Sequence, residues 1–264
     1  MEWKMKPRLQ YYDNKYFMFA SGGADLWRTH KGRKIDLKTQ TVLNIMNIQK
    51  NEKVLDIGCG RGELSYQCIK KRGKVTAIDF SKKALEFAEI TFKNLSEYGK
   101  KYLEVHEMDA RLLKFPDNTF DVVVMADIAE HMKKYELIIS LQQIRKVLKP
   151  TGRLIIHTLP NKNLLNKANW VKYLSFGEVE VTPKGCEDVF VHLNELSPQD
   201  LTEMLTKCGF TAKVWADILN DNAQFNAIRG HKIIKWLLKW TGLMKWFGVS
   251  VFAIAHKDLN YERD

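Results

Sequence analysis

The stretch that decides the fold is Val54-Leu55-Asp56-Ile57-Gly58-Cys59-Gly60-Arg61-Gly62-Glu63-Leu64. Its first half is typical of a short β-strand, because Val, Leu and Ile dominate and the run is too brief for a buried helix. Glycines then alternate at 58, 60 and 62, where the missing Cβ permits positive φ and lets a flat ligand lie against the backbone. The helix expected next has unpaired N–H groups at its start. We therefore predict a strand, a tight ligand-binding loop and a helix.

Length and composition are those of a globular protein. The chain has 264 residues, of which 45% are hydrophobic, and a net charge of +11. Cys59, Cys68, Cys186 and Cys208 have no paired or metal-like spacing, so we expect neither disulfides nor a metal site. The first residues are charged and lack a signal-peptide core, and no run reaches the roughly 18 apolar residues of a membrane span. We therefore expect a cytoplasmic protein.

Apolar runs of strand length alternate with helical patterns as far as residue 158. The expected strands are 53–56, 74–79, 102–106, 120–125 and 153–158, and the expected helices are 35–48, 63–71, 82–97 and 135–148. Such alternation favours a parallel, doubly wound α/β sheet. A helix that begins at Ser197-Pro198 and two more strands, 210–218 and 249–256, complete the pattern.

Acidic residues stand at the ends of three of these strands. Asp56 ends the first strand, Asp79 ends the second, and Asp109 follows the third. Ligands of open α/β sheets bind at the carboxyl ends of the strands, where an acid can accept hydrogen bonds from ribose hydroxyls or an adenine amino group. A dinucleotide loop needs glycine where Glu63 stands, and Asp56 would repel a pyrophosphate. The three acids therefore predict a nucleoside with little negative charge.

With these motifs the chain resembles the class I S-adenosylmethionine-dependent methyltransferases. The resemblance rests on VLDIGCGRGEL, AIDFS, MDA, FDVVV with IAEHM, and LKPTGRLIIHTLPN. It covers residues 50–160 well and 197–210 more loosely. It implies a Rossmann-like, doubly wound sheet of seven strands, mostly parallel, with the last strand antiparallel and supplied by 249–256. It also implies S-adenosyl-L-methionine as the cofactor.

The resemblance also implies a role for individual residues. Gly58, Cys59 and Gly60 would wrap the amino-acid end of the cofactor, which Asp56 orients. Asp79 would hold the ribose hydroxyls. The other positions carried over are Phe80 on the adenine face, Asp109 and Ala110 at the adenine edge, and Met125 and Asp127 beside the methionine part and the reaction centre.

Methyl transfer requires fewer specific side chains than cofactor binding does. Holding the acceptor in line with the methyl group supplies much of the rate, and a general base is needed only when the acceptor loses a proton. Glu130 and His131 are the catalytic candidates; the alternative is that this pair organises the loop and contacts the cofactor. His157 is interpreted as a core or rim histidine.

Segments outside the regular pattern are expected to form the acceptor side. Residues 1–34, aromatic and basic, read as an arm that serves as a substrate lid, and 35–264 as the methyltransferase domain with insertions at 161–195 and 219–248. Residues 229–247 hold five basic residues and no acid, and from 231 they form an amphipathic pattern rich in Trp. This pattern suits a membrane-surface helix, and equally a lid or dimer helix, so a monomer and a homodimer both stay open.

The expected reaction is methyl transfer to a small-molecule or lipid-like acceptor, at the inner face of the membrane if 229–247 binds lipid. The alternatives are a nicotinamide-dependent oxidoreductase, disfavoured by Glu63, a binding module without activity, and a nucleic-acid or protein methyltransferase. Ala126-Asp127-Ile128-Ala129 differs from the Asn/Asp-Pro-Pro-aromatic run of enzymes that methylate base amino groups, and no RNA-binding module is visible, which disfavours nucleic acid.

Overall fold

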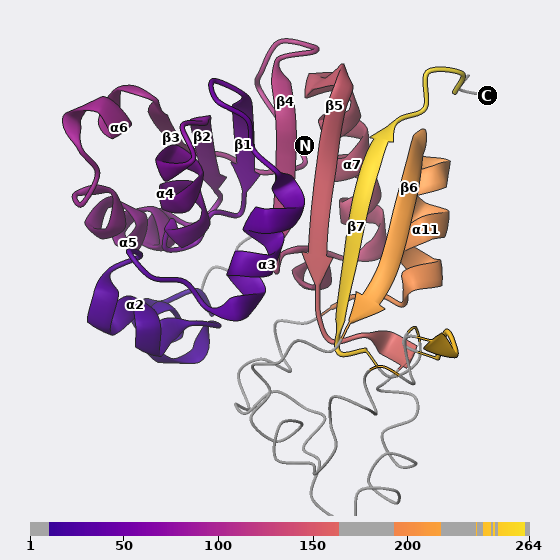
Figure 1. Cartoon of the computed structure of the whole chain (residues 1–264), viewed down its shortest axis with the longest axis horizontal. Coiled ribbons are helices and arrows are strands. Elements are labelled where there is room, and N and C mark those ends of the chain that lie inside the picture. The colour runs from indigo at the N-terminus through magenta and orange to yellow at the C-terminus, as the bar shows by residue number, and fades with distance from the viewer. Residues whose placement is uncertain are drawn as a thin grey trace, which may run out of the picture.

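Figure 1 presents a computed structural model of the chain. It describes residues 11–163, 193–217, 236, 240–243, 245 and 248–261. Most of the two predicted insertions, the first ten residues of the arm and most of 229–247 lie outside these ranges. Within the described part, no helix has the length and apolar character needed to cross a bilayer.

The core of the molecule is a seven-stranded sheet in the order β3-β2-β1-β4-β5-β7-β6. β7 runs antiparallel to its neighbours β5 and β6, and the remaining strands pair in parallel. The predicted Rossmann-like fold is thereby confirmed. The strands are β1 Lys53–Ile57, β2 Lys74–Asp79, β3 Leu103–Glu107, β4 Phe120–Ala126, β5 Leu148–Thr158, β6 Phe210–Asp217 and β7 Ser250–Lys257.

Helices cover both faces of this sheet. Alternate residues of a strand point to opposite faces, so Leu55 packs in one core cluster while its neighbour Val54 packs in the other. The first cluster also contains residues of α7 and α11, and the second contains residues of α3, α4 and α5. The helices are α3 Leu37–Met46, α4 Glu63–Lys70, α5 Lys82–Phe92, α6 Glu97–Lys101, α7 Lys134–Val147 and α11 Pro198–Lys207, and η2 is a short turn at Ala129–His131.

Two predicted elements differ from the structure by more than two residues at one end. The helix expected over 82–97 ends at Phe92, and α6 begins separately because the Ser96 side chain accepts a hydrogen bond from the Gly99 N–H and caps a new helix. The strand expected over 153–158 already begins at Leu148, which pairs with Phe120 across an irregularity in the ladder. Neither difference moves the carboxyl ends of the strands.

The described part of the arm forms two short helices, η1 (Tyr16–Ala20) and α2 (Ala24–His30). Tyr12, Phe17 and Trp27 pack with Phe87 of α5 in a small aromatic cluster, and the Trp27 Nε1–H donates to Thr91 Oγ1 at 2.8 Å. Burying an aromatic ring of this size stabilises by roughly 1.5–3 kcal/mol. The arm is therefore anchored on α5, and Figure 1 shows α2 at the end of the sheet toward which β5 points.

Candidate functional site

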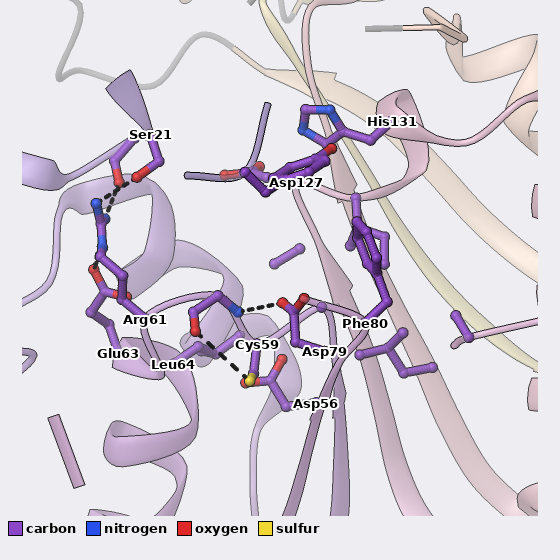
Figure 2. A pocket seen from close by; sticks show the side chains of 18 of the residues that line it. Ser21, Asp56, Cys59, Arg61, Glu63, Leu64, Asp79, Phe80, Asp127 and His131 are labelled. Carbon is purple, nitrogen blue, oxygen red and sulfur yellow. Dashed lines mark hydrogen bonds and ion pairs between the residues drawn. The ribbon is translucent and has the colours of Figure 1, made fainter. Parts of the chain in front are cut away.

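A cavity of about 450 Å³ opens at the carboxyl ends of β1, β2 and β4. The strand order changes direction between β1 and β4, which is the place where ligands of open α/β sheets bind. Ten of the twelve predicted site residues line it, as Figure 2 shows for several of them: Asp56, Gly58, Cys59, Gly60, Asp79, Phe80, Asp109, Ala110, Asp127 and His131. Met125 and Glu130 do not.

The glycine loop follows β1 and bends through positive φ. Gly58, Gly60 and Gly62 have φ of 70°, 53° and 79°. A Cβ on Gly58 would come within 2.9 Å of Ile128, whereas a Cβ on Gly60 would meet no atom within 4 Å. Because Gly60 lines the cavity, this backbone faces space that a ligand can fill.

Asp79 joins the loop to the end of β2. Its Oδ2 accepts the Gly60 N–H at 3.0 Å and its Oδ1 accepts the Ser81 N–H at 2.9 Å. Each oxygen keeps a lone pair that can accept a ligand hydroxyl. Burial raises the pKa of Asp79 to about 6, against the lowering effect of these backbone donors. Asp56 accepts the Ser65 hydroxyl at 2.6 Å, and burial raises its pKa to about 6 as well.

At the opposite end of the predicted nucleoside site, Asp109 is bound by Arg111. The Arg111 guanidinium donates to both carboxylate oxygens at 2.6–3.0 Å, and the Arg111 N–H donates to Oδ1 at 2.9 Å. Arg111 also pairs with Glu136 of α7 at 2.7 Å. The lone pairs of Asp109 are therefore largely occupied, and its contact with an adenine amino group stays a prediction. Sequence reasoning missed Arg111, although it stands only two residues after Asp109.

Asp127, directly after β4, belongs to a charged cluster. Lys38 Nζ forms an ion pair with Asp127 Oδ2, and His157 Nδ1 lies 2.5 Å from Asp127 Oδ1. His157 has no exposed surface, as expected of a core histidine. Sequence reasoning missed Lys38, because it is 89 positions from Asp127 and only the packing of α3 beside β4 brings them together.

Glu130, one of the two catalytic candidates, does not line the cavity. Glu130 is 1% exposed, accepts the Thr158 hydroxyl at 2.7 Å, and has a pKa raised to about 7 by burial. Its carbonyl also accepts the N–H groups of Leu193 and Asn194. These bonds tie Glu130 to β5 and to the segment before α11, and its side chain does not line the cavity, whereas its neighbour His131 does.

Met125 is likewise placed away from the cavity. Its side chain has no exposed surface and packs in the core cluster on the α7 side of the sheet. The expectation that it borders the methionine part is therefore corrected for its side chain. The alternation of side chains along β4 explains this, because the strand ends one residue later at Ala126, which does line the cavity.

Arg61 holds the arm against the glycine loop. Its guanidinium donates to the carbonyls of Phe17 at 2.8 Å and Gly22 at 2.5 Å, and to the Ser21 hydroxyl at 2.5 Å. It also pairs with Glu63, and its side chain is only 4% exposed. Arm residues including Tyr12, Tyr16 and Phe17 consequently form one wall of the cavity.

The charges that line the cavity fit S-adenosylmethionine, a nucleoside that carries a net positive charge. Seven acidic and five basic side chains line it among the described residues, namely Asp36, Asp56, Glu63, Asp79, Asp109, Asp127 and Glu136 against Lys34, Lys38, Arg61, Arg111 and Lys133. Asp79 offers acceptors to a ribose and Gly60 leaves space beside the loop. A pyrophosphate would instead meet the buried carboxylates of Asp56 and Asp79.

Comparison with known proteins agrees with this geometry. Residues 48–209 match the family model described as a methyltransferase domain, and the chain belongs to this family, whose cofactor is S-adenosylmethionine. It is 28% identical over 149 residues to a demethylmenaquinone methyltransferase of Staphylococcus epidermidis, a match that covers 55% of this chain and 54% of that protein.

Two further similarities extend the comparison. A mitochondrial ubiquinone biosynthesis O-methyltransferase of Schizosaccharomyces pombe is 30% identical over 179 residues, covering 67% of this chain and 62% of that protein. The match therefore spans only about half to three fifths of either relative. The solved structure of a SAM-dependent methyltransferase from Methanosarcina mazei shares the fold with a TM-score of 0.56 and 22% identity, over 81% of this chain and 96% of that one.

Replacing Gly60 with alanine should weaken binding of S-adenosylhomocysteine at least tenfold, about 1.4 kcal/mol, in isothermal titration calorimetry. The added methyl group faces the cavity and strains a φ of 53°. Gly242→Ala is the matched control, since its φ is 69°, its Cβ would meet nothing within 4 Å, and it does not line the cavity. Equal affinity in both variants would contradict this placement of the cofactor.

Binding of S-adenosylhomocysteine should weaken as the pH falls through about 6, the pKa of Asp79. Hydroxyl groups of the ligand form stronger hydrogen bonds with the ionised carboxylate than with the protonated one, so affinity is full above this pH and falls by up to about tenfold per unit below it. Because the folded pKa lies above the ordinary value of 3.8, protonation of this group stabilises the fold, and acid unfolding through Asp79 does not explain the loss.

The control for this pH dependence is Asp79→Asn. We expect it to bind about 10- to 100-fold more weakly at pH 7.5, from the loss of a charge-assisted hydrogen bond, and to have a shallower pH profile. Asp56, with a pKa also raised to about 6, keeps the remaining slope. A profile as steep as that of the wild type would contradict the role of Asp79.

Proposed function

We propose that the chain transfers the methyl group of S-adenosylmethionine to a small, apolar, hydroxyl-bearing acceptor of the quinol type. The observation that carries the proposal is the cavity itself, in which the aromatic wall of the arm faces the ends of β1 and β4. Tyr12, Phe17, Ile128 and Met132 give this side an apolar surface. The names of the two curated relatives, which refer to menaquinone and ubiquinone, support the acceptor class.

The residues of the chain would act mainly by placement. When bound, S-adenosylmethionine supplies an electrophilic methyl group. Asp79 and the glycine loop would fix the nucleoside, and the arm, held by Arg61, would exclude water and align the acceptor. His131 lies in the cavity, where it could take the proton that the acceptor hydroxyl releases.

The second candidate function, from another enzyme class, is that of a nicotinamide-dependent oxidoreductase. Against it stands Glu63, which occupies the glycine position of a dinucleotide loop and is held by Arg61 at 2.8 Å. Calorimetric titration with NAD and with S-adenosylhomocysteine separates the two, and tighter binding of NAD would reverse our assignment. A protein without activity would bind S-adenosylhomocysteine and fail the transfer assay below.

The proposed reaction is tested with methyl-labelled S-adenosylmethionine and a panel of reduced naphthoquinols and benzoquinols, sugars, fatty acids and RNA. We expect label in a quinol product. Asp79→Asn should give at least a hundredfold less label, because a hundredfold loss corresponds to about 2.7 kcal/mol of binding free energy of the cofactor and the transition state. Lys100→Met, on the exposed helix α6, is the control with unchanged rate. Transfer to RNA alone would contradict the proposed acceptor class.

We also propose that the segment 229–247 brings the protein to the inner surface of the membrane, where such an acceptor would reside. Trp236 and Trp240 are 61% and 74% exposed, and their rings stack with centroids 6.1 Å apart. The Asn161 side chain, just after β5, donates to the carbonyls of Lys245 and Gly248 at 3.1 and 2.9 Å. The exposed Trp pair and the excess of basic residues suit an anionic lipid surface.

Co-sedimentation with vesicles that contain about 30% anionic phosphatidylglycerol, which gives the vesicles a negative surface potential, tests this contact. The wild type should pellet more than Trp236→Ala/Trp240→Ala and more than Lys232→Glu/Lys235→Glu/Lys239→Glu. Leu259→Ala, at an equally exposed site of 72%, is the control. Equal and negligible pelleting of all variants, together with a concentration-dependent dimer lost in the Trp variant, would assign the segment to self-association.

A further inference from the structure

The ammonium group of Lys38 is a charged donor in the wall of the cavity. Lys38 projects from α3, lines the cavity and has a side chain that is 19% exposed. An ammonium carries three N–H donors, and among the described residues only Asp127 Oδ2 accepts one of them. Two donors are therefore left for a ligand in the cavity.

The partner of this ammonium is itself firmly held. His157 binds Asp127 Oδ1, and the Asp127 N–H donates to the His157 carbonyl at 3.0 Å while Asp127 keeps a positive φ of 57°. Since an ionised carboxylate only accepts, Nδ1 of His157 must carry the proton of the 2.5 Å contact. Nε2 of His157 is buried and has no hydrogen-bond partner among the described residues.

This cluster cannot serve as a general base at neutral pH. Burial opposes ionisation of Asp127, but Lys38 and His157 outweigh it and hold its pKa well below the usual range. Burial likewise opposes the charge of Lys38, while Asp127, Asp36 and Glu130 raise its pKa. Lys38 thus stays protonated and Asp127 stays ionised. What the cluster offers a ligand is a fixed cationic donor.

We propose that the Lys38 ammonium, held in place by Asp127 and His157, binds the methyl acceptor through an ionised hydroxyl group, so that the acceptors are phenols or enols that bind as oxyanions. The proton of that hydroxyl leaves on binding, to His131 in the same cavity and from there to solvent. An anionic oxygen is the ligand that forms the strongest hydrogen bonds with an ammonium. This inference rests on the proposed function and narrows its substrate class, because a neutral alcohol or an amine would not exploit the site.

The position of the cluster fits an acceptor subsite. Asp127 follows the end of β4, next to Ile128 and close in sequence to His131, and all three line the cavity. A Cβ built on Gly22 of the arm would lie 3.0 Å from Lys38 Nζ, so the ammonium sits where the arm meets the sheet. Asp79, which would take the ribose, ends β2 on the other side of β1. The ammonium and the ribose site therefore belong to different parts of the cavity.

The experiment uses 4-nitrophenol as an acceptor analogue whose ionised form absorbs visible light. The full-length protein is titrated with the probe, with and without saturating S-adenosylhomocysteine, and the pH is varied to find the apparent pKa of the bound phenol. In the wild type we expect this pKa to lie about one to two units below that of the free phenol, because an opposite charge at contact distance favours the ionised form.

Three variants distinguish the charge of Lys38 from its structural role. Lys38→Gln keeps a neutral donor for Asp127 and should lose the shift, Lys38→Met should lose it too, and Lys38→Arg should keep most of it. Lys100→Met is the control, since Lys100 forms an exposed ion pair with Glu97 on α6 and does not line the cavity. Thermal melting of each variant shows that it is folded, and Lys38→Gln remains informative if Lys38→Met is not.

A bound-phenol pKa that is unshifted in the wild type, or shifted equally in Lys38→Gln, overturns the inference. So does a loss of more than tenfold in S-adenosylhomocysteine affinity in Lys38→Gln with no change at the phenol, because the ammonium would then serve the carboxylate of the cofactor. Failure of the proposed function is recognised separately, as absence of methyl transfer by a wild type that does bind and ionise the probe.

Discussion

The hydrogen bond from the Gly60 N–H to Asp79 Oδ2, at 3.0 Å, is the interaction on which the site depends. It joins the loop after β1 to the end of β2, two strands that pair in parallel from Lys53 and Lys74 onward. Gly60 itself adopts a φ of 53°, which glycine reaches without the steric strain that a Cβ adds. Because this hydrogen bond already holds the loop in place, ligand binding costs less conformational entropy than it would with a mobile loop.

Arg61, the next residue, extends this fixed loop to the arm. The same guanidinium contacts two arm carbonyls, the Ser21 hydroxyl and Glu63, so the arm wall of the cavity and the glycine loop share one buried cation. The aromatic cluster of Trp27 with Phe87 adds apolar burial to the same contact. The arm is thus part of the structure of the site, and its placement would be coupled to the state of the loop.

Four of the aspartates that line the cavity are of two kinds. Asp56 and Asp79 are buried with hydroxyl or backbone donors, and burial raises the pKa of each to about 6, so they titrate close to neutrality. Asp109 and Asp127 are paired with cations, and their carboxylates are already satisfied within the protein. The first kind can still accept hydrogen bonds from a ligand, whereas the second kind positions a cation. The acceptors therefore lie at the ends of β1 and β2, and the paired carboxylates lie on either side of them, Asp109 after β3 and Asp127 with Lys38 after β4.

The sequence by itself determined the sheet, the glycine loop and the order of acids at the strand ends. These depend on local rules, namely the alternation of apolar side chains along strands such as β4 and the freedom of Gly58 and Gly60 to adopt positive φ. The tertiary structure alone decided which side chains meet. Lys38 and Asp127 are 89 positions apart, Arg61 reaches an arm 39 to 44 positions before it, and Glu130 turns toward Thr158 and away from the cavity. Such contacts follow from how helices pack on the sheet, and no spacing in the sequence encodes them.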